Sequence, residues 1–257
     1  MLAAFSLQGK VAVVTGGARG LGMEMMDALA EAGASVVALD LLADQAREAA
    51  TAIGVRHGVR AASWALDTTN STQVTDTFAR IEAEFGQVDI LVAAAGIVEN
   101  VAAEDTSAAS WRRIIDVNIN GVFFCAQAAG RSMIARRTGS IILIASMSGQ
   151  IVNRPQKQAS YNTSKAGVIM MAKSLAAEWA PSGVRVNALA PGYMRTAMTD
   201  QVLAAQPALR DAWEEMTPMG RMGAPPELRG SVVFLASDAS SYVTGHALVV
   251  DGGYTAW

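Results

Sequence analysis

The residues with the clearest chemical potential form the motif Tyr161-Asn-Thr-Ser-Lys165. Residues four positions apart share one face of a helix, so we expect the phenol and the ammonium group to be neighbours. A phenol ionises at about pH 10, and a nearby ammonium group is expected to lower that pKa. Such a tyrosine can remove the proton of an alcohol or return it in the reverse reaction. The alternative is an ordinary amphipathic helix in which the two residues have no joint role.

Two further polar residues are predicted to act with this pair. Ser146 ends an apolar segment, where its hydroxyl can hold a substrate oxygen, and Ser148 is the rival for that role. Asn118 lies in Asp116-Val-Asn-Ile-Asn-Gly121 and is expected in a helix, where it could anchor a water that passes protons to Lys165. An asparagine that bridges an irregular helical turn is the structural alternative, and it is compatible with that role.

A glycine-rich turn lies between an apolar segment and a helical one. Its glycines allow the backbone to turn tightly and to approach a pyrophosphate, which the amides and the dipole at the start of the helix favour. A glycine-rich turn without a ligand is the alternative. The cofactor-binding residues predicted in this turn are Gly16, Arg19, Gly20, Leu21 and Gly22.

Asp40 ends the second apolar segment, where a carboxylate can accept hydrogen bonds from an adenosine ribose. A carboxylate there repels the 2′-phosphate of NADP, whereas the guanidinium of Arg19 would attract it. We give more weight to Asp40, and the sequence therefore predicts NAD rather than NADP. The alternative role for Asp40 is that of a helix N-cap.

Residues that follow other apolar segments complete the predicted cofactor site. Asp67 is expected to bind the adenine amino group, or alternatively to cap a helix. The turn at Pro191 and Gly192 is expected to hold the nicotinamide carboxamide, with Thr196 as a side-chain partner. The other residues predicted to contact the cofactor are Leu41, Thr68, Ala94, Ala95, Gly96, Met194, Tyr161 and Lys165.

These motifs lie between alternating strand-like and helix-like segments. Short apolar runs predict strands at 10–15, 35–39, 60–66, 88–93, 140–145, 184–190 and 247–250. Helical periodicity predicts helices at 21–32, 43–53, 72–85, 110–136, 161–180 and 224–237, the fourth as one helix or two abutting ones. Strand–helix alternation with nearly continuous apolar strands is typical of a parallel sheet covered on both faces. We therefore predict one α/β domain over residues 1–257, with a doubly wound sheet.

The interval 193–223 interrupts this alternation and is rich in Met, Pro and Gln. A long irregular insert after a strand is often a lid over the substrate. The alternative is a pair of ordinary surface helices.

The composition narrows the functional classes. The chain has 257 residues, a formal net charge of −3 and no basic block, which argues against binding to nucleic acid. Its one cysteine, Cys125, can form neither an internal disulfide nor a cysteine-based metal site, and we expect a buried apolar thiol. No signal peptide and no membrane span are expected, so we predict a cytoplasmic enzyme without a membrane partner.

Together these motifs resemble those of the short-chain dehydrogenases/reductases, from about Gln8 to Trp257. The resemblance implies a seven-stranded Rossmann-type sheet, a Ser–Tyr–Lys–Asn proton system and a homotetramer packed partly through its long helices. Its motifs are Thr15-Gly-x-x-x-Gly20-x-Gly22, Asp67, Asn118, Ser146, Tyr161-x-x-x-Lys165, Pro191-Gly192 and Asp251-Gly252-Gly253. One departure is Ala93-Ala-Ala-Gly96, where the family has Asn-Asn-Ala-Gly. Ala93 cannot tie neighbouring strands together as the first asparagine does.

Three segments resemble those of sugar-alcohol dehydrogenases such as galactitol, arabinitol and mannitol dehydrogenases. They are Ser146 to Gln156, Met216-Thr-Pro-Met-Gly220 and the ending Asp251 to Trp257. The resemblance implies a polyol substrate whose hydroxyls meet Ser146, Ser148, Asn153 and Gln158. The alternative is a polar loop whose side chains only satisfy one another's hydrogen bonds. Similar galactitol enzymes can carry Mg²⁺ near the C-terminus, which Trp257 would fit, but the sequence has no acidic cluster for it and predicts no metal ligand.

Three functions are consistent with these residues. The first is an NAD-dependent oxidoreductase that interconverts a secondary alcohol, such as a polyol, and its ketone. The second is an NADPH-dependent carbonyl or 3-ketoacyl reductase, which Arg19 supports and Asp40 opposes. The third is a non-catalytic cofactor-binding protein, against which the complete set of polar residues at 118, 146, 161 and 165 argues.

Overall fold

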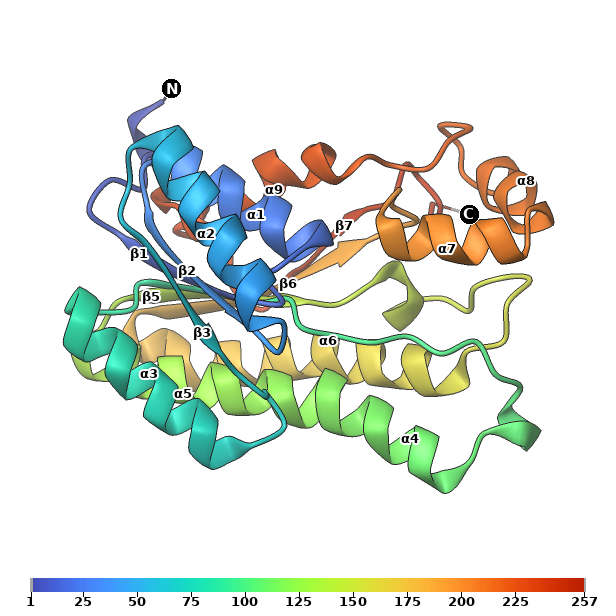
Figure 1. Ribbon diagram of the computed structural model, residues 1–257, viewed down its shortest axis with the longest axis horizontal. Coiled ribbons are helices and arrows are strands. Elements are labelled where there is room, and N and C mark those ends of the chain that lie inside the picture. The colour runs from blue at the N-terminus through green and yellow to red at the C-terminus, as the bar shows by residue number, and fades with distance from the viewer. Residues whose placement is uncertain (1, 257) are drawn as a thin grey trace.

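The computed structural model describes residues 2–256, and a parallel sheet of seven strands forms its centre (Figure 1). The strands follow the order β3-β2-β1-β4-β5-β6-β7, and all of the pairings are parallel. They are β1 (Val11–Thr15), β2 (Ser35–Asp40), β3 (Ala61–Ala65), β4 (Ile90–Ala93), β5 (Gly139–Ile144), β6 (Val184–Pro191) and β7 (Ala247–Val250). Each predicted strand is present, with ends shifted by at most two residues. The predicted α/β fold is therefore confirmed.

Helices connect the strands in the expected alternation. They are α1 (Gly20–Glu31), α2 (Ala43–His57), α3 (Ser71–Phe85), α4 (Ala108–Ile115), α5 (Val122–Arg136), α6 (Ala159–Trp179), α7 (Ala197–Ala205), α8 (Ala208–Glu215) and α9 (Arg229–Ala236). The segment predicted as one long helix or two abutting helices is α4 and α5, joined by a π-helical turn at Asp116–Gly121. The last predicted helix starts as a 3₁₀ turn at Pro225–Leu228 before α9. No helix within residues 2–256 is both long enough and apolar enough to cross a membrane.

Both faces of the sheet are buried, which explains why its strands are continuous apolar runs. Along β1, Val11 and Val13 belong to one hydrophobic cluster, whereas Ala12 and Val14 belong to the other. Helices α1, α2 and α9 cover one face, and α3, α5 and α6 cover the other (Figure 1). Cys125 is fully buried in the second layer, where desolvation raises the pKa of its thiol to about 12, as expected for an apolar filler.

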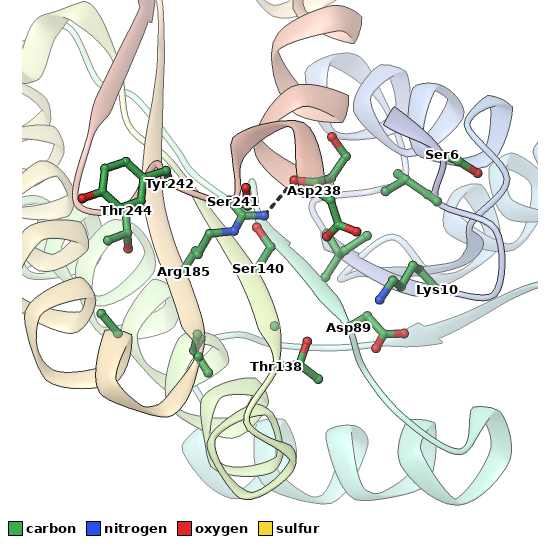
Figure 2. Close-up of a pocket in the computed structure, with 18 residues that line it drawn as sticks. Ser6, Lys10, Asp89, Thr138, Ser140, Arg185, Asp238, Ser241, Tyr242 and Thr244 are labelled. Atoms are coloured by element: carbon green, nitrogen blue, oxygen red, sulfur yellow. Dashed lines mark hydrogen bonds between the residues drawn. The ribbon is translucent and has the colours of Figure 1, made fainter. Parts of the chain in front are cut away.

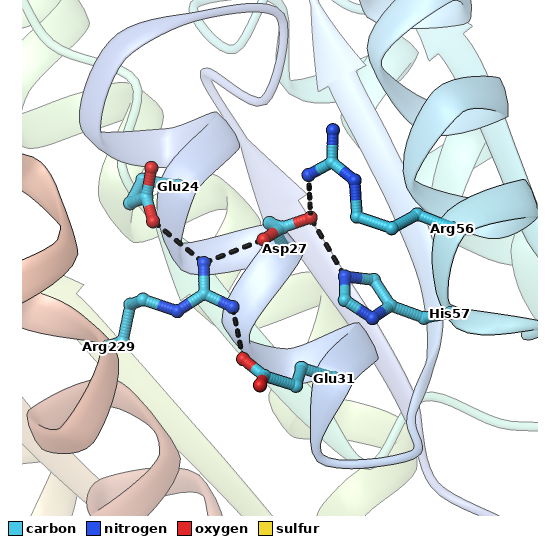
Figure 3. A network of polar contacts seen from close by, with 6 residues as sticks. All are labelled: Glu24, Asp27, Glu31, Arg56, His57 and Arg229. Atoms are coloured by element: carbon cyan, nitrogen blue, oxygen red, sulfur yellow. Dashed lines mark hydrogen bonds and ion pairs between the residues drawn. The ribbon is translucent and has the colours of Figure 1, made fainter.

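A charged network joins the three helices of the first layer (Figure 3). Arg229 of α9 donates to Glu24 at 2.7 Å and to Asp27 at 2.6 Å, and it also pairs with Glu31. The Asp27 carboxylate accepts from Arg56 at 2.8 Å as well, and lies 2.9 Å from the His57 ring nitrogen. The network therefore fixes α2 and α9 against α1, the helix that begins at the glycine-rich turn.

The interval 193–223 contains α7 and α8, as its alternative interpretation expected. These helices bury a small hydrophobic cluster separate from the two sheet layers. Its buried members are Leu203, Leu209, Trp213 and Met222, and Tyr193 and Val202 pack against it. The interval is thus a compact unit of its own, and its role as a lid stays a prediction.

Candidate active site

The predicted site residues gather at one edge of the sheet. Strands β2 and β4 flank β1, so the chain order reverses there, and open α/β sheets bind their ligands in the crevice at the carboxyl ends of such strands. Loops that follow the carboxyl ends of six strands carry nearly all the predicted residues. By strand, they are Gly16 to Gly22 after β1, Asp40 and Leu41 at β2, Asp67 and Thr68 after β3, Ala94 to Gly96 after β4, Ser146 and Ser148 after β5, and Pro191 to Thr196 at β6.

Tyr161 and Lys165 lie in the first turns of α6, on the helix face turned towards the sheet. Lys165 is 5% exposed, and its Nζ donates to the Ile144 carbonyl at 2.8 Å. The same nitrogen lies 5.6 Å from the centre of the Tyr161 ring. Burial lowers the pKa of Lys165 to about 8, because desolvation disfavours the ammonium form. The predicted pair is therefore in place.

The expected lowering of the Tyr161 pKa is not found. Burial raises the pKa of this phenol, and the Ser146 hydroxyl beside it acts in the opposite direction without reversing the shift. The prediction was wrong because it counted the charge of Lys165 and left out the desolvation of the phenolate. Tyr161 is therefore protonated at neutral pH.

Asn118 occupies the π-helical turn and is completely buried. Its Oδ1 accepts from the Ile97 amide at 2.9 Å, and its Nδ2 donates to the Ile97 carbonyl at 2.9 Å and to Ser164 Oγ at 3.0 Å. The structural alternative is therefore present: Asn118 ties the irregular turn to the loop after β4. A Cβ placed on Gly96 would lie 3.4 Å from both Asn118 Oδ1 and Lys165 Nζ. Because Gly96 has no side chain, it does not cover these two polar atoms.

Ser146 directly follows β5 and connects to the next loop. Its Oγ donates to Ser148 Oγ at 3.0 Å and accepts from the Ser148 amide at 3.1 Å. It also lies 3.5 Å from the Pro191 carbonyl. Both serines are at most 8% exposed. The structure therefore brings the two rival hydroxyls together beside the phenol of Tyr161.

The glycine-rich turn has the geometry of a pyrophosphate cradle. Gly16 and Gly20 have φ values of 69° and 59°, in the left-handed region that favours glycine. A Cβ on Gly22 would lie 2.1 Å from the Gly16 carbonyl oxygen. Arg19 stands at the N-cap of α1 and provides no side-chain cap, so the first amides of the helix are open to an anion. These residues fit a dinucleotide cofactor.

Asp40 ends β2 next to this turn. Its Oδ2 accepts from the Ala18 amide at 3.1 Å, and its Oδ1 accepts from the Leu42 amide at 3.0 Å. Two backbone donors therefore fix the carboxylate, whereas Arg19 and Leu41 are exposed beside it. Leu42, and not Asp40, is the N-cap of α2.

Asp67 and Thr68 follow β3. The Oδ1 of Asp67 accepts from the amide of Thr69 at 2.9 Å and from its hydroxyl at 2.7 Å. Asn70 caps α3, which removes the alternative of Asp67 as the cap. Thr68 is buried against the π-helical turn, since a Cβ on Gly121 would lie 2.7 Å from its Oγ1. This fit couples the loop that is predicted to contact adenine to the turn that carries Asn118.

A hydroxyl group and a backbone contact join the loop after β4 to the end of β1 and the turn that follows it. Thr15 Oγ1, at the end of β1, accepts from the Ala95 amide at 3.2 Å. A Cβ on Gly16 would lie 2.9 Å from the Ala95 nitrogen, so the two loops touch through their backbones. Ala93 and Ala94 instead fill apolar positions next to the two sheet layers.

After β6, the turn at Gly192 packs on the chain near the C-terminus, because a Cβ there would lie 2.6 Å from Asp251 Cα. Met194 is 4% exposed. Thr196 caps α7, and its Oγ1 accepts from the Thr199 amide at 3.3 Å. The cap holds this loop at the edge where the carboxamide is predicted to bind.

The predicted substrate residues form one hydrogen-bonded group. Gln158 Nε2 lies 3.3 Å from Ser148 Oγ, 3.1 Å from Asn153 Oδ1 and 2.8 Å from Asn162 Oδ1. An amide group has two hydrogens, so these three acceptors cannot all be served at once. The group therefore retains capacity to bind an additional hydroxyl.

Three residues of this group were not predicted. Tyr193 OH accepts from Asn153 Nδ2 at 3.1 Å and from Gln156 Nε2 at 2.6 Å. Trp213 Nε1 donates to Gln156 Oε1 at 3.1 Å. The available signals were an aromatic residue directly after Pro191-Gly192 and a tryptophan inside the insert.

No group of three or more His, Cys, Asp or Glu side chains in the described part of the chain is arranged to hold a metal ion. The Mg²⁺ implied by the resemblance is therefore not supported by these residues. Trp257, which was connected with that idea, lies outside the described residues.

A pocket of about 640 Å³ opens at the opposite edge of the sheet (Figure 2). Two of its charged groups, Arg185 and Asp89, are engaged in holding the fold. Arg185 donates to the carbonyls of Leu235 and Ser237, both at 3.0 Å, and to Ser240 Oγ at 2.7 Å. Asp89 accepts from the Val11 amide at 2.8 Å. We therefore place the active site at the carboxyl edge.

Comparison with known proteins agrees with this geometry. A family model described as enoyl-(acyl carrier protein) reductase matches residues 16–255. A galactitol 2-dehydrogenase (L-tagatose-forming) of Cereibacter sphaeroides is 46% identical over 98% of each chain. The crystal structure of gox2181 superposes with a TM-score of 0.96 at 47% identity, over 99% of this chain and 98% of that one. The structure of a gluconate 5-dehydrogenase from Burkholderia cenocepacia, in complex with NADP and tartrate, has a TM-score of 0.94 at 37% identity and covers 99% and 98%.

Proposed function

The chain belongs to the short-chain dehydrogenase/reductase family, and on that premise we propose that it interconverts a secondary alcohol of a polyol and the corresponding ketone. The observation that carries the proposal is the convergence of Ser146, Tyr161, Lys165 and Asn118 at the carboxyl edge, next to an open cradle for a dinucleotide. A nicotinamide cofactor, when bound, accepts a hydride from the carbinol carbon or returns it.

Tyr161 handles the proton in this mechanism. Burial keeps its phenol protonated at neutral pH, which suits a general acid for ketone reduction. Alcohol oxidation requires the phenolate: Tyr161 first loses its proton to solvent, the phenolate oxygen then takes up the hydroxyl proton, and the ammonium group of Lys165 stabilises the phenolate. Ser146 holds the substrate oxygen against the phenol, so that the reacting groups meet in a fixed geometry.

The polar group beyond Ser146 supports a polyol as substrate. Ser148, Asn153 and Gln158 are at most 7% exposed, and the surplus of acceptors around Gln158 Nε2 leaves bonding capacity for substrate hydroxyls. Buried polar groups that are satisfied only when the substrate carries hydroxyls discriminate strongly against analogues without them. The similarity to a galactitol 2-dehydrogenase (L-tagatose-forming) supports the same substrate class.

We propose NAD as the preferred cofactor. Two backbone amides hold the Asp40 carboxylate in place. The carboxylate therefore cannot rotate away to relieve its repulsion of the 2′-phosphate of NADP. Like charges about 4 Å apart cost about 1 kcal/mol in water and about 4 kcal/mol at a dielectric constant of about 20. Exposed Arg19 and the NADP bound by the gluconate dehydrogenase support the opposite choice, and a direct comparison of the two cofactors will decide between them.

The test is a spectrophotometric assay with NAD or NADP against a panel of polyols and simple secondary alcohols. Reduced nicotinamide formed with a vicinal polyol, faster than with a simple alcohol, is the expected result. Tyr161→Phe should lose at least about 100-fold in turnover while cofactor binding, followed by protein fluorescence, is unchanged. No turnover across the panel, or full activity in this variant, would contradict the proposed function.

Three further features stay predictions. Light scattering tests the homotetramer, and cell fractionation tests the cytoplasmic location. Limited proteolysis with and without polyol tests whether the interval 193–223 closes as a lid, since a closed lid is expected to be cut more slowly.

A further inference from the structure

Side chains from three segments form a chain of hydrogen bonds that starts at the catalytic serine and ends at Tyr193. From Ser146 the hydrogen bonds pass to Ser148, Gln158, Asn153 and then Tyr193. Tyr193 lies two residues after Pro191, whose carbonyl is the second partner of Ser146 Oγ. This chain of hydrogen bonds therefore connects the serine proposed to hold the reacting oxygen with a phenol of the lid segment, the interval 193–223.

The hydroxyl of Tyr193 can act only as a donor in any hydrogen bond beyond those it makes with Asn153 and Gln156. Its oxygen accepts two hydrogen bonds, from Asn153 and Gln156, which occupies both lone pairs. Burial, opposed by these two donors and reinforced by the neighbouring Tyr254 phenol, raises the pKa of Tyr193 well above its usual value. The phenol thus stays protonated, and the neighbouring hydroxyl of Tyr254 is the side chain in the described residues that competes for its O–H proton. Tyr193 can therefore only donate in a further hydrogen bond, and a substrate hydroxyl would have to replace Tyr254 as the acceptor.

The ring of Tyr193 is held rigidly in this position. It stacks on Trp213 with the ring centres 4.1 Å apart and the planes inclined by 8°. Trp213 Nε1 donates to Gln156 Oε1 and so directs the amide group of Gln156 to the Tyr193 oxygen. Tyr254 packs edge-on against the same ring at 5.5 Å and is the competing acceptor, although its own hydroxyl is directed to Met216 Sδ. A donor fixed in this way loses little entropy when it binds.

We propose that Tyr193 is a specificity residue that donates a hydrogen bond to a substrate hydroxyl remote from the reacting carbon, so that the enzyme prefers long polyols to short ones. Gln156 and Trp213 are positioning residues that act through Tyr193. This inference rests on the proposed function and deepens it by assigning chain-length selection to the lid segment.

The test compares a hexitol with butane-2,3-diol, which offers the same vicinal group without a remote hydroxyl. Tyr193→Phe keeps the ring and removes only the donor. We expect kcat/KM for the hexitol to fall about tenfold, through a higher KM at constant kcat, because a bond made equally in the ground and transition states is lost. The values for butane-2,3-diol should not change.

Two variants serve as controls. Tyr254→Phe removes the competing phenol from the same aromatic cluster, and we expect it to leave the preference for the hexitol in place. Trp213→Phe keeps an aromatic ring and removes the Nε1 donor, and we expect a smaller loss on the hexitol in the same direction. Fluorescence titration with the cofactor shows whether each variant still binds it as the unaltered enzyme does.

The outcomes separate this inference from the proposed function. An unaltered enzyme inactive on every polyol overturns both. An enzyme active on the hexitol whose Tyr193→Phe variant keeps its preference, or loses equally on both substrates, overturns the inference alone. A loss confined to the hexitol, with Tyr254→Phe unaffected, supports it.

Discussion

Lys165 Nζ lies 5.6 Å from the centre of the Tyr161 ring, and the surrounding protein removes both polar groups from water. Burial drives the two in opposite directions: the pKa of Lys165 falls and that of Tyr161 rises. Both shifts favour the neutral forms, so a charge on either group at the proposed site of proton transfer destabilises the folded state. The pair therefore has measurable consequences for stability as well as for activity.

The first prediction concerns stability against pH. The folded pKa of Lys165 is about 8, whereas its ordinary value is 10.5. Between these values the unfolded chain binds the proton that the folded chain releases, so Lys165 makes the free energy of unfolding rise with pH. From about pH 7 to 9.5 the rise amounts to about 2 kcal/mol. Lys165→Met should remove it.

Urea unfolding of both proteins at the two pH values measures this difference, and other titrating groups cancel in the comparison. The matched control is Lys173→Met, on the exposed face of the same helix, which should keep the rise of the unaltered chain. A parallel pH dependence in Lys165→Met and the unaltered protein would show that burial does not destabilise the ammonium form.

The second prediction concerns the glycine-rich turn. Gly22→Ala places a Cβ 2.1 Å from the Gly16 carbonyl oxygen, so the turn must shift. We expect a loss of about 1–3 kcal/mol in the free energy of unfolding and a cofactor affinity at least about tenfold lower. Gly230→Ala, also in the first turn of a helix, meets no atom within 4 Å and should stabilise by about 0.5–1 kcal/mol. Wild-type cofactor affinity in Gly22→Ala would refute the role of the turn.

The sequence allowed the strands and the main catalytic residues to be predicted because their signals are local. A strand buried on both faces is a continuous apolar run, as in Val11–Thr15, and Tyr161 and Lys165 lie within one helical turn of each other. The carboxyl ends of parallel strands then bring distant loops together without further information.

What could not be predicted depends on contacts between distant segments. Tyr193 meets Gln156 across 37 residues, and Trp213 meets it across 57, with no periodic pattern to indicate either contact. The direction of the Tyr161 pKa shift depends on burial, which spacing does not show. The π-helical turn at Asp116–Gly121 has the same apolar pattern as an α-helix, and only the contacts of Asn118 reveal its purpose.

The third prediction concerns the charged network between α1, α2 and α9. Burial raises the pKa of Asp27, but hydrogen bonds and charge from Arg229 and His57 outweigh it, and the net pKa is lowered. Asp27 therefore stabilises the fold above its ordinary pKa of 3.8, and this contribution is lost as the pH falls through the folded value. Asp27→Asn should lower the free energy of unfolding at pH 7 by about 1–3 kcal/mol.

Urea unfolding checks this value, with Asp44→Asn as the control. Asp44 pairs with Arg47 within α2, but its side chain is 81% exposed, and we expect a change below about 0.5 kcal/mol. The gap between Asp27→Asn and the unaltered protein should narrow in acid below pH 3.8, where the carboxylate is lost. If the difference in the free energy of unfolding did not change with pH, packing and not the charge of Asp27 would hold the helices together.

The fourth prediction concerns the choice of cofactor. Asp40→Asn removes the negative charge but keeps an acceptor for the Ala18 or Leu42 amide. The repulsion of about 1–4 kcal/mol from a 2′-phosphate then disappears, so the ratio of kcat/KM for NADP to that for NAD should rise about tenfold to a thousandfold. Arg19→Ala in the same background should reverse part of the gain, because the guanidinium is the available partner for that phosphate.

Asp67→Asn, which alters the other carboxylate of the predicted adenosine site, is the control and should affect both cofactors alike. A ratio that does not move in Asp40→Asn would show that Asp40 does not select the cofactor, and the preference would then have to come from the backbone of the turn itself.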